Sequence, residues 1–198
     1  MWEDRYAAED GFLFGRAPAA FLAENPWLTQ GAESALCVAD GEGRNSVWIA
    51  GQGLDVTSFD LSSTAVARAN GLAAELGVSL NAHVSDWEAW DWSRQFDMVV
   101  AIFIQFVGPD GRARQFETLK QAVRPGGRIV MHGYTPEQIE LGTGGPPSAA
   151  NMYTPQMLSQ AFDGWKIERL AAYEREVQEG RGHSGRSALI DLVARKPE

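Results

Sequence analysis

Short apolar runs alternate with longer amphipathic stretches along most of this chain. Runs at about 34–39, 54–59, 78–84 and 96–101 are apolar enough, and short enough, to be buried strands. The stretches between them repeat apolar residues at helical spacing. Strands that alternate with helices predict an α/β fold with a mostly parallel sheet.

Two of the intervening helices can be placed from this spacing and from glycine. A helix over about 43–51 follows the first run, and the helix after the second run ends at Gly77, a C-cap residue. The apolar face of that second helix contains Ala65, Ala69, Leu72 and Leu76. After the fourth run, a buried helical stripe of Phe116, Leu119 and Val123 leads into a tight turn and a fifth strand that ends near Met131.

The end of the chain has a different pattern. Two strands, at about 165–173 and 187–194, are joined by a glycine-rich turn at 180–185. A hairpin of this kind is antiparallel, so one strand near the end of the sheet should run against the others.

The turn after the first strand has the features of a nucleotide-binding loop. Gly41 and Gly43 let the backbone turn sharply and approach a ligand, and the helix that follows directs its free N–H groups at that ligand. Asp60, at the end of the second strand, can accept hydrogen bonds from a ribose diol. The alternative is that two glycines simply form a strand-to-helix turn and that Asp60 caps the next helix.

These features together resemble the class I S-adenosylmethionine (SAM) dependent methyltransferases. The glycine loop, the acid after the second strand and the Arg-Pro-Gly-Gly turn at 124–127 follow in that family's order. Within it, residues 41–45, 134–146 and 174–185 resemble the small bacterial enzymes of the tellurite-resistance type. The resemblance implies one Rossmann-like, three-layer α/β/α domain over 1–198. Its seven-stranded sheet should have the order 3-2-1-4-5-7-6 with an antiparallel last strand.

The resemblance also implies SAM as cofactor, with S-adenosylhomocysteine as its product, and assigns contacts. The acid after the second strand would bind the ribose, and the acid after the third strand would bind the adenine amino group. The expected cofactor residues are Trp2, Tyr6, Gly15, Asp40, Gly41, Glu42, Gly43, Asn45, Asp60, Leu61, Asp86, Trp87, Ile102 and Gln105.

Three of these assignments have structural alternatives. Residues 1–28 are aromatic and should form a lid over the cofactor, with Arg5 near its methionine end, but they could equally cover a sheet edge. Trp87 could be a packing wedge, and Gln105 could cap the following helix instead of touching cofactor or acceptor.

The chain departs from the family at its best-known acid. In most members an Asp or Glu orients the methionine amino group, but Cys37 stands at that position, and Ala39 replaces the usual first glycine. Asp40 or Glu42 is expected to supply the missing negative charge from a shifted place.

Methyl transfer needs alignment more than acid–base chemistry, and proximity alone supplies effective molarities of roughly 10⁵ to 10⁸ M. A thiolate, selenide or telluride needs no base, whereas a hydroxyl or ammonium acceptor does. His183, with Glu174 or Glu176 nearby, is the candidate catalytic residue, although it could merely bind a loop carbonyl. Residues with weaker support for facing the acceptor are Arg16, His132, Tyr134, Tyr153 and Arg181. No metal-ligand set is predicted.

Composition narrows the partners. The formal charge is −9, the pI is about 4.9 and the basic residues are scattered, which disfavours nucleic acid and favours a small-molecule acceptor. The resemblance to the tellurite-resistance type favours a thiol or chalcogen among such acceptors. One cysteine and the lack of a long apolar segment or leader predict a cytoplasmic protein without membrane contact, as a monomer or homodimer.

Two other functions remain open. A non-catalytic nucleotide-binding protein would keep the glycine loop and Asp60. A nicotinamide-dependent oxidoreductase is less favoured, because Ser46 stands where the third glycine of the dinucleotide signature belongs and because such a fold would end on a parallel strand.

Overall fold

The computed structural model describes residues 2–180 and 183–198. Contacts divide the chain into two compact units, Met1–Asp91 with Glu179–Gly182 and Trp92–Gln178 with His183–Glu198. They are called the first and the second unit below. The single domain over 1–198 stays a prediction.

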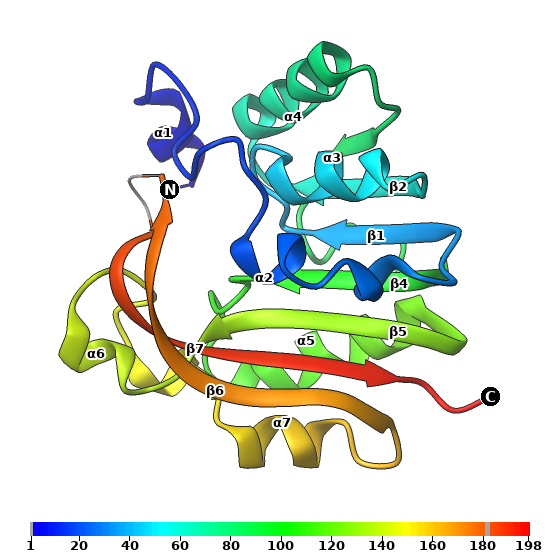
Figure 1. Ribbon diagram of the computed structural model, residues 1–198, viewed down its shortest axis with the longest axis vertical. Coiled ribbons are helices and arrows are strands. Elements are labelled where there is room, and N and C mark those ends of the chain that lie inside the picture. The colour runs from blue at the N-terminus through cyan, green and yellow to red at the C-terminus, as the bar shows by residue number, and fades with distance from the viewer. Residues whose placement is uncertain (1, 181–182) are drawn as a thin grey trace. The chain divides into compact units, whose positions relative to one another are not determined.

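Seven strands form one sheet in the order β3-β2-β1-β4-β5-β7-β6 (Figure 1). The β1–β2, β2–β3 and β4–β5 pairs are parallel, whereas β5 and β7 are antiparallel. The predicted Rossmann-like α/β fold, its strand order and its reversed strand are therefore confirmed.

The first unit alternates strands and helices after a helical N-terminal segment. Its elements are α1 (Trp2–Ala7), α2 (Ala20–Ala23), η1 (Pro26–Thr29), β1 (Ser34–Val38), α3 (Arg44–Gly51), β2 (Asp55–Asp60), α4 (Ser63–Leu76) and β3 (Asn81–Val84). Helices α3 and α4 pack on each other through Val47, Leu72 and Ala73.

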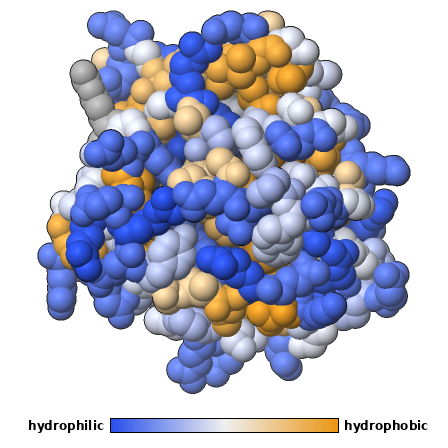
Figure 2. All heavy atoms as spheres, viewed as in Figure 1, coloured by the Kyte–Doolittle hydropathy of each residue, from blue (hydrophilic) through white to orange (hydrophobic). Residues whose placement is uncertain are grey.

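Helix α4 forms where its caps and apolar face predict it. The Ser62 hydroxyl accepts a hydrogen bond from the Ala65 N–H at 3.0 Å, and Gly77 ends the helix at φ 67°. Ala65, Ala69 and Leu72 are buried as expected, but Leu76 is 58% exposed. Figure 2 shows hydrophobic surface over this helix on a face that is otherwise largely hydrophilic.

The second unit contains the other strands. Its elements are β4 (Phe96–Ile102), α5 (Pro109–Ala122), β5 (Val123–Tyr134), α6 (Gln138–Leu141), η2 (Ala149–Asn151), α7 (Pro155–Ala161), β6 (Lys166–Glu179, whose last residue belongs to the first unit) and β7 (His183–Arg195). Every residue of β4 is buried, as in a parallel strand covered on both faces.

Several predicted boundaries were wrong. The third strand starts at Asn81 rather than 78, and Val123 begins β5 instead of ending the preceding helix. Both hairpin strands are longer than expected, because they extend through polar residues that the apolar pattern does not mark.

Candidate functional site

The loop between β1 and α3 has a left-handed backbone at alternate positions. The φ angles are 46° at Ala39, 61° at Gly41 and 83° at Gly43, the N-cap of α3. The Asp40 N–H donates to the Phe59 carbonyl at 3.1 Å, so the loop stays attached to the end of β2. Ala39 thus keeps the conformation for which a glycine is usual.

Both glycines allow close approaches within the first unit. A Cβ on Gly41 would lie 2.6 Å from the Tyr6 hydroxyl oxygen, and one on Gly43 would lie 2.5 Å from the Cβ of Ala69 on α4. The lack of a side chain at Gly41 therefore lets Tyr6 pack against the loop, and the lack of one at Gly43 lets α4 pack against it.

Asp60 is the acid that organises this loop. Its Oδ2 accepts from the Gly41 N–H at 2.8 Å and its Oδ1 accepts from the Ser62 N–H at 2.9 Å. Burial raises the pKa of Asp60. A carboxylate has about four acceptor positions, so two backbone bonds leave capacity for a diol. The next residue, Leu61, is exposed.

The two acids that could replace the one missing at Cys37 differ in what they bind. Glu42 is 3% exposed, and its carboxylate binds Arg68 Nη1 at 2.7 Å and the Leu13 N–H at 2.8 Å. Asp40 is partly exposed and accepts a hydrogen bond from the Ser46 hydroxyl. Loss of hydration raises the pKa of Asp40 to about 6.

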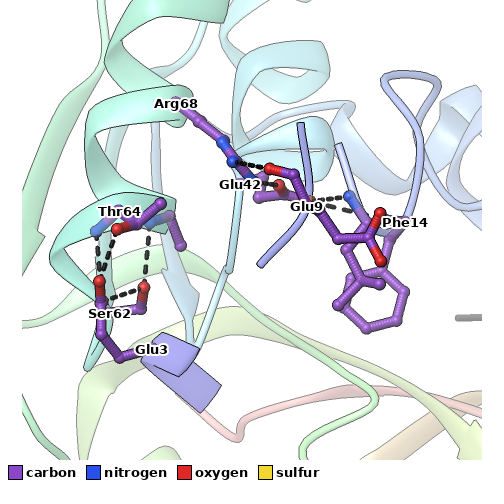
Figure 3. A network of polar contacts seen from close by, with 9 residues as sticks. Glu3, Glu9, Phe14, Glu42, Ser62, Thr64 and Arg68 are labelled. Atoms are coloured by element: carbon purple, nitrogen blue, oxygen red, sulfur yellow. Dashed lines mark hydrogen bonds and ion pairs between the residues drawn. The ribbon is translucent and has the colours of Figure 1, made fainter. Parts of the chain in front are cut away.

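The N-terminal segment is tied to the loop and to α4 at two places, which we call the Glu42 latch and the Glu3 latch (Figure 3). In the Glu42 latch, Arg68 bridges Glu42 and the Glu9 carbonyl. In the Glu3 latch, the Glu3 carboxylate accepts from the hydroxyls of Ser62 at 2.6 Å and Thr64 at 2.5 Å.

Three aromatic rings of the N-terminal segment contact one another. Trp2, Tyr6 and Phe14 contact one another with centroids 6.0 to 6.3 Å apart, and the Arg5 guanidinium lies 4.4 Å from the centre of the Trp2 ring. Tyr6 is buried, whereas Trp2 is exposed.

Asn45 and Gly15 have structural partners in the first unit. The Asn45 Oδ1 accepts from the Ala19 N–H at 2.9 Å. Gly15 packs against Gly180, whose own added Cβ would lie 2.5 Å from the Leu13 carbonyl. Their cofactor roles stay predictions.

Asp86 and Trp87 follow β3. Asp86 is exposed and accepts from the Ala89 N–H at 2.7 Å, which closes a turn. Trp87 packs edge-on against Phe59 at 6.0 Å, so the packing role that was its alternative is present. Neither contact tests adenine binding.

In the second unit, Ile102 ends β4 and the next residue, Phe103, has a φ of 56°. Gln105 is buried, and its amide bonds to both backbone groups of Tyr134 at 2.7 Å. Gln105 does not cap α5, whose N-cap is Gly108. Its amide is already bonded to Tyr134, which does not favour a contact with the cofactor, and that contact stays a prediction.

His183 lies in an aromatic cluster of the second unit. Its Nδ1 is 2.5 Å from the Tyr134 hydroxyl, and its ring stacks on Phe103 with centroids 4.1 Å apart at 20°. Of the two acids expected near it, Glu174 pairs with Arg186 at 2.7 Å and Glu176 is exposed.

A buried acid in β7 was missed by the sequence analysis. Asp191 is 0% exposed and accepts from His132 Nδ1 at 2.7 Å, Arg169 Nε at 2.8 Å and the Tyr173 hydroxyl at 3.2 Å. The sequence feature that could have revealed it is a single acid within the otherwise apolar run 188–194.

The weaker candidates for the acceptor side have varied surroundings. Arg16 forms an exposed ion pair with Glu75, Tyr153 is buried, and Arg181 lies outside the described residues. Over residues 2–180 and 183–198, no cluster of three metal-ligating side chains occurs. Within those same ranges, no helix is long and apolar enough to cross a membrane.

Comparison with known proteins gives one family match and several similar folds. Residues 35–127 match the model of a family described as a methyltransferase domain. Among curated proteins, none matches the chain.

Three solved structures illustrate the likeness of the fold. One comes from work on the conversion of a disulfide bond into a thioacetal group during echinomycin biosynthesis (TM-score 0.80, 20% identity, 99% of this chain and 90% of that one). TehB from Haemophilus influenzae has a TM-score of 0.74 at 16% identity, over 98% of this chain and 67% of TehB. The N-methyltransferase NodS from Bradyrhizobium japonicum WM9, in complex with S-adenosylhomocysteine, has a TM-score of 0.73 at 12% identity, over 100% and 97%.

Proposed function

Since this chain carries a class I, SAM-dependent methyltransferase domain, we propose that it transfers the methyl group of SAM to a small-molecule acceptor, with a thiol or chalcogen acceptor favoured. The family match and the sheet order confirm the resemblance to class I methyltransferases. The acceptor and the individual site residues are the proposal.

The acidic glycine loop is the observation that carries the proposal. SAM has positive charges on its sulfonium and ammonium groups and a ribose diol that donates hydrogen bonds. Asp40 and Asp60 lie on either side of the loop, so the negative charge and the hydrogen-bond acceptors of the first unit fit this molecule. When bound, SAM supplies an electrophilic methyl group.

We assign the ammonium contact to Asp40 rather than to Glu42. The Glu42 charge is already neutralised by Arg68 at 2.7 Å inside the Glu42 latch. Asp40 is partly exposed, and a cation beside it would remove the cost that now raises its pKa. Asp60 binds the ribose in this assignment, Asp86 the adenine amino group, and Leu61 and Trp87 offer apolar contacts.

The acceptor side is proposed to involve His183 as its catalytic residue. The aromatic cluster of Phe103, Tyr134 and His183 offers a polarizable surface that suits a soft sulfur-type acceptor. The similar fold solved in work on forming a thioacetal from a disulfide bond points in the same direction.

An acceptor panel tests the reaction class. The protein is incubated with SAM and, in parallel, with matched thiols, alcohols and amines, and S-adenosylhomocysteine release is measured. Turnover confined to thiols is expected. Tight SAM binding without turnover of any compound would instead support a non-catalytic binding protein.

A further inference from the structure

The contact between His183 and Tyr134 bears on which proton His183 carries. The phenolic oxygen lies 2.5 Å from Nδ1, His183 is buried, and Phe103 stacks on the face of its ring. A neutral imidazole has one N–H donor and one acceptor nitrogen, so this hydrogen bond sets the tautomer.

The phenol is the donor in this pair. A tyrosine hydroxyl has a reference pKa of about 10, while a neutral imidazole N–H is far less acidic and its bare nitrogen is the stronger acceptor. Nδ1 of His183 therefore accepts from Tyr134, and the proton of the neutral ring resides on Nε2.

Tyr134 and the Phe103 ring that stacks on His183 are both held in place. The backbone of Tyr134 is fixed by the Gln105 amide, and its ring packs with Met152, Val177 and Leu189. Phe103 keeps its left-handed backbone through a 2.8 Å bond from its N–H to the His132 carbonyl. Strain of this kind persists where the surroundings over-determine a conformation, often at functional sites.

Two carboxylates of the second unit, those of Glu174 and Asp191, are bound by other side chains. Glu174 binds Arg186, and Asp191 binds His132, Arg169 and Tyr173. The Tyr134 phenol contacts Nδ1 of His183, whereas a carboxylate at that nitrogen would have favoured the opposite tautomer.

We propose that Tyr134 is a positioning residue that holds His183 in its Nε2–H tautomer, so that the acceptor reacts as a preformed thiolate or chalcogen anion. This rests on the proposed function. His183 then donates a hydrogen bond to the anion and removes no proton from it. The thiolate's electron pair forms the new S–C bond, and the pair of the breaking bond stays on the sulfonium sulfur. The thiol proton has already gone to solvent. The negative charge of the thiolate and the positive charge of the sulfonium are therefore both removed by the transfer, and no base is needed.

Nuclear magnetic resonance of the ¹⁵N-labelled full chain tests the tautomer directly. Long-range ¹H–¹⁵N spectra distinguish the two ring nitrogens, and His183→Gln identifies the His183 signals among the three histidines. At a pH where the ring is neutral, protonated Nε2 and bare Nδ1 are expected. A protonated Nδ1 in the wild type would overturn the proposal, even if the Tyr134 variant does not fold.

Two matched variants test the role of Tyr134. In Tyr134→Phe the donor is lost, so His183 should populate both tautomers. Tyr173→Phe removes a hydroxyl that binds Asp191 and should leave the His183 spectrum unchanged. An unchanged spectrum in Tyr134→Phe would contradict the proposal.

The form of the acceptor is tested with benzenethiol and 4-nitrobenzenethiol as probes. If the thiolate is preformed, the midpoint of each pH–rate profile should follow the pKa of the thiol itself. A common midpoint for both thiols, or no turnover of either, would contradict the thiolate part. Calorimetry with SAM separates failure of the proposed function from failure of this proposal. If the protein does not bind SAM, the proposed function is wrong, but the tautomer measured by NMR is unaffected.

Discussion

At the residue scale, Ala39 and Phe103 are the described non-glycine residues with a positive φ, 46° and 56°. Each directly follows the end of a parallel strand, β1 in the first unit and β4 in the second. Ligands of open α/β folds bind at the carboxyl ends of such strands. In each unit, a left-handed residue therefore stands at the strand end where such folds bind ligands.

Ala39→Gly should stabilise the protein. A left-handed conformation costs a residue with a Cβ about 1 to 2 kcal/mol, and the greater freedom of glycine in the unfolded chain offsets part of that, so a net gain of about 0.5 to 1 kcal/mol is expected. The measurement is urea unfolding. Ala74→Gly, on the exposed face of α4, is the control and should lose about 1 kcal/mol. A loss at Ala39 would contradict the account of this loop.

Asp40 should make SAM binding depend on pH. Its pKa of about 6 means that a cationic ligand binds with release of a proton below that pH. Affinity should fall about tenfold between pH 7 and 5, whereas a plateau is expected above pH 7. The folding stability of the free protein should depend on pH in the opposite direction. A raised carboxyl pKa stabilises the folded state at low pH, and this contribution is lost as the pH rises through 6.

Calorimetry across pH 5 to 8 measures this dependence. Asp40→Asn should bind weakly with a flat profile, and Glu42→Gln should keep the wild-type slope. If Glu42→Gln abolishes the slope and Asp40→Asn does not, the assignment of the ammonium contact is reversed.

At the scale of elements, the N-terminal segment depends on the two latches that join it to the glycine loop and α4. Arg68→Met leaves the buried Glu42 carboxylate without its cation, so a loss of roughly 3 kcal/mol is expected. Hydrogen exchange in residues 2–14 should accelerate as well.

Arg16→Met is the matched control for this prediction. Its partner Glu75 and its own side chain are both exposed, and solvent screening leaves such surface pairs with little effect on stability. Equal losses in the two variants, or unchanged exchange in residues 2–14, would show that the Glu42 latch does not hold the segment.

The elements were more predictable than their side-chain partners. Local spacing placed the strands, the caps of α4 and the glycine loop, because each depends on neighbouring residues. The pairing of Glu42 with Arg68 joins residues 26 apart, and that of His183 with Tyr134 joins residues 49 apart. Proximity in sequence suggested Glu174 for His183, and tertiary packing selected a phenol instead.

At the scale of the whole molecule, a formal charge of −9 suits a cationic cofactor better than a polyanion. The acids that carry the argument are few, namely Asp40 and Asp60 beside the glycine loop. The remaining charge says nothing about the acceptor, since an acidic surface is also a general aid to solubility.

Calorimetric titration of the full chain with SAM, with NAD in parallel, tests the central claim most directly. The wild type should bind SAM and not NAD. Asp60→Ala should weaken SAM binding by roughly 1.5 to 3 kcal/mol, the value of hydrogen bonds to a charged group, while Asp55→Ala at the exposed start of β2 should not. No binding of SAM, or equal affinity in Asp60→Ala, would contradict the account.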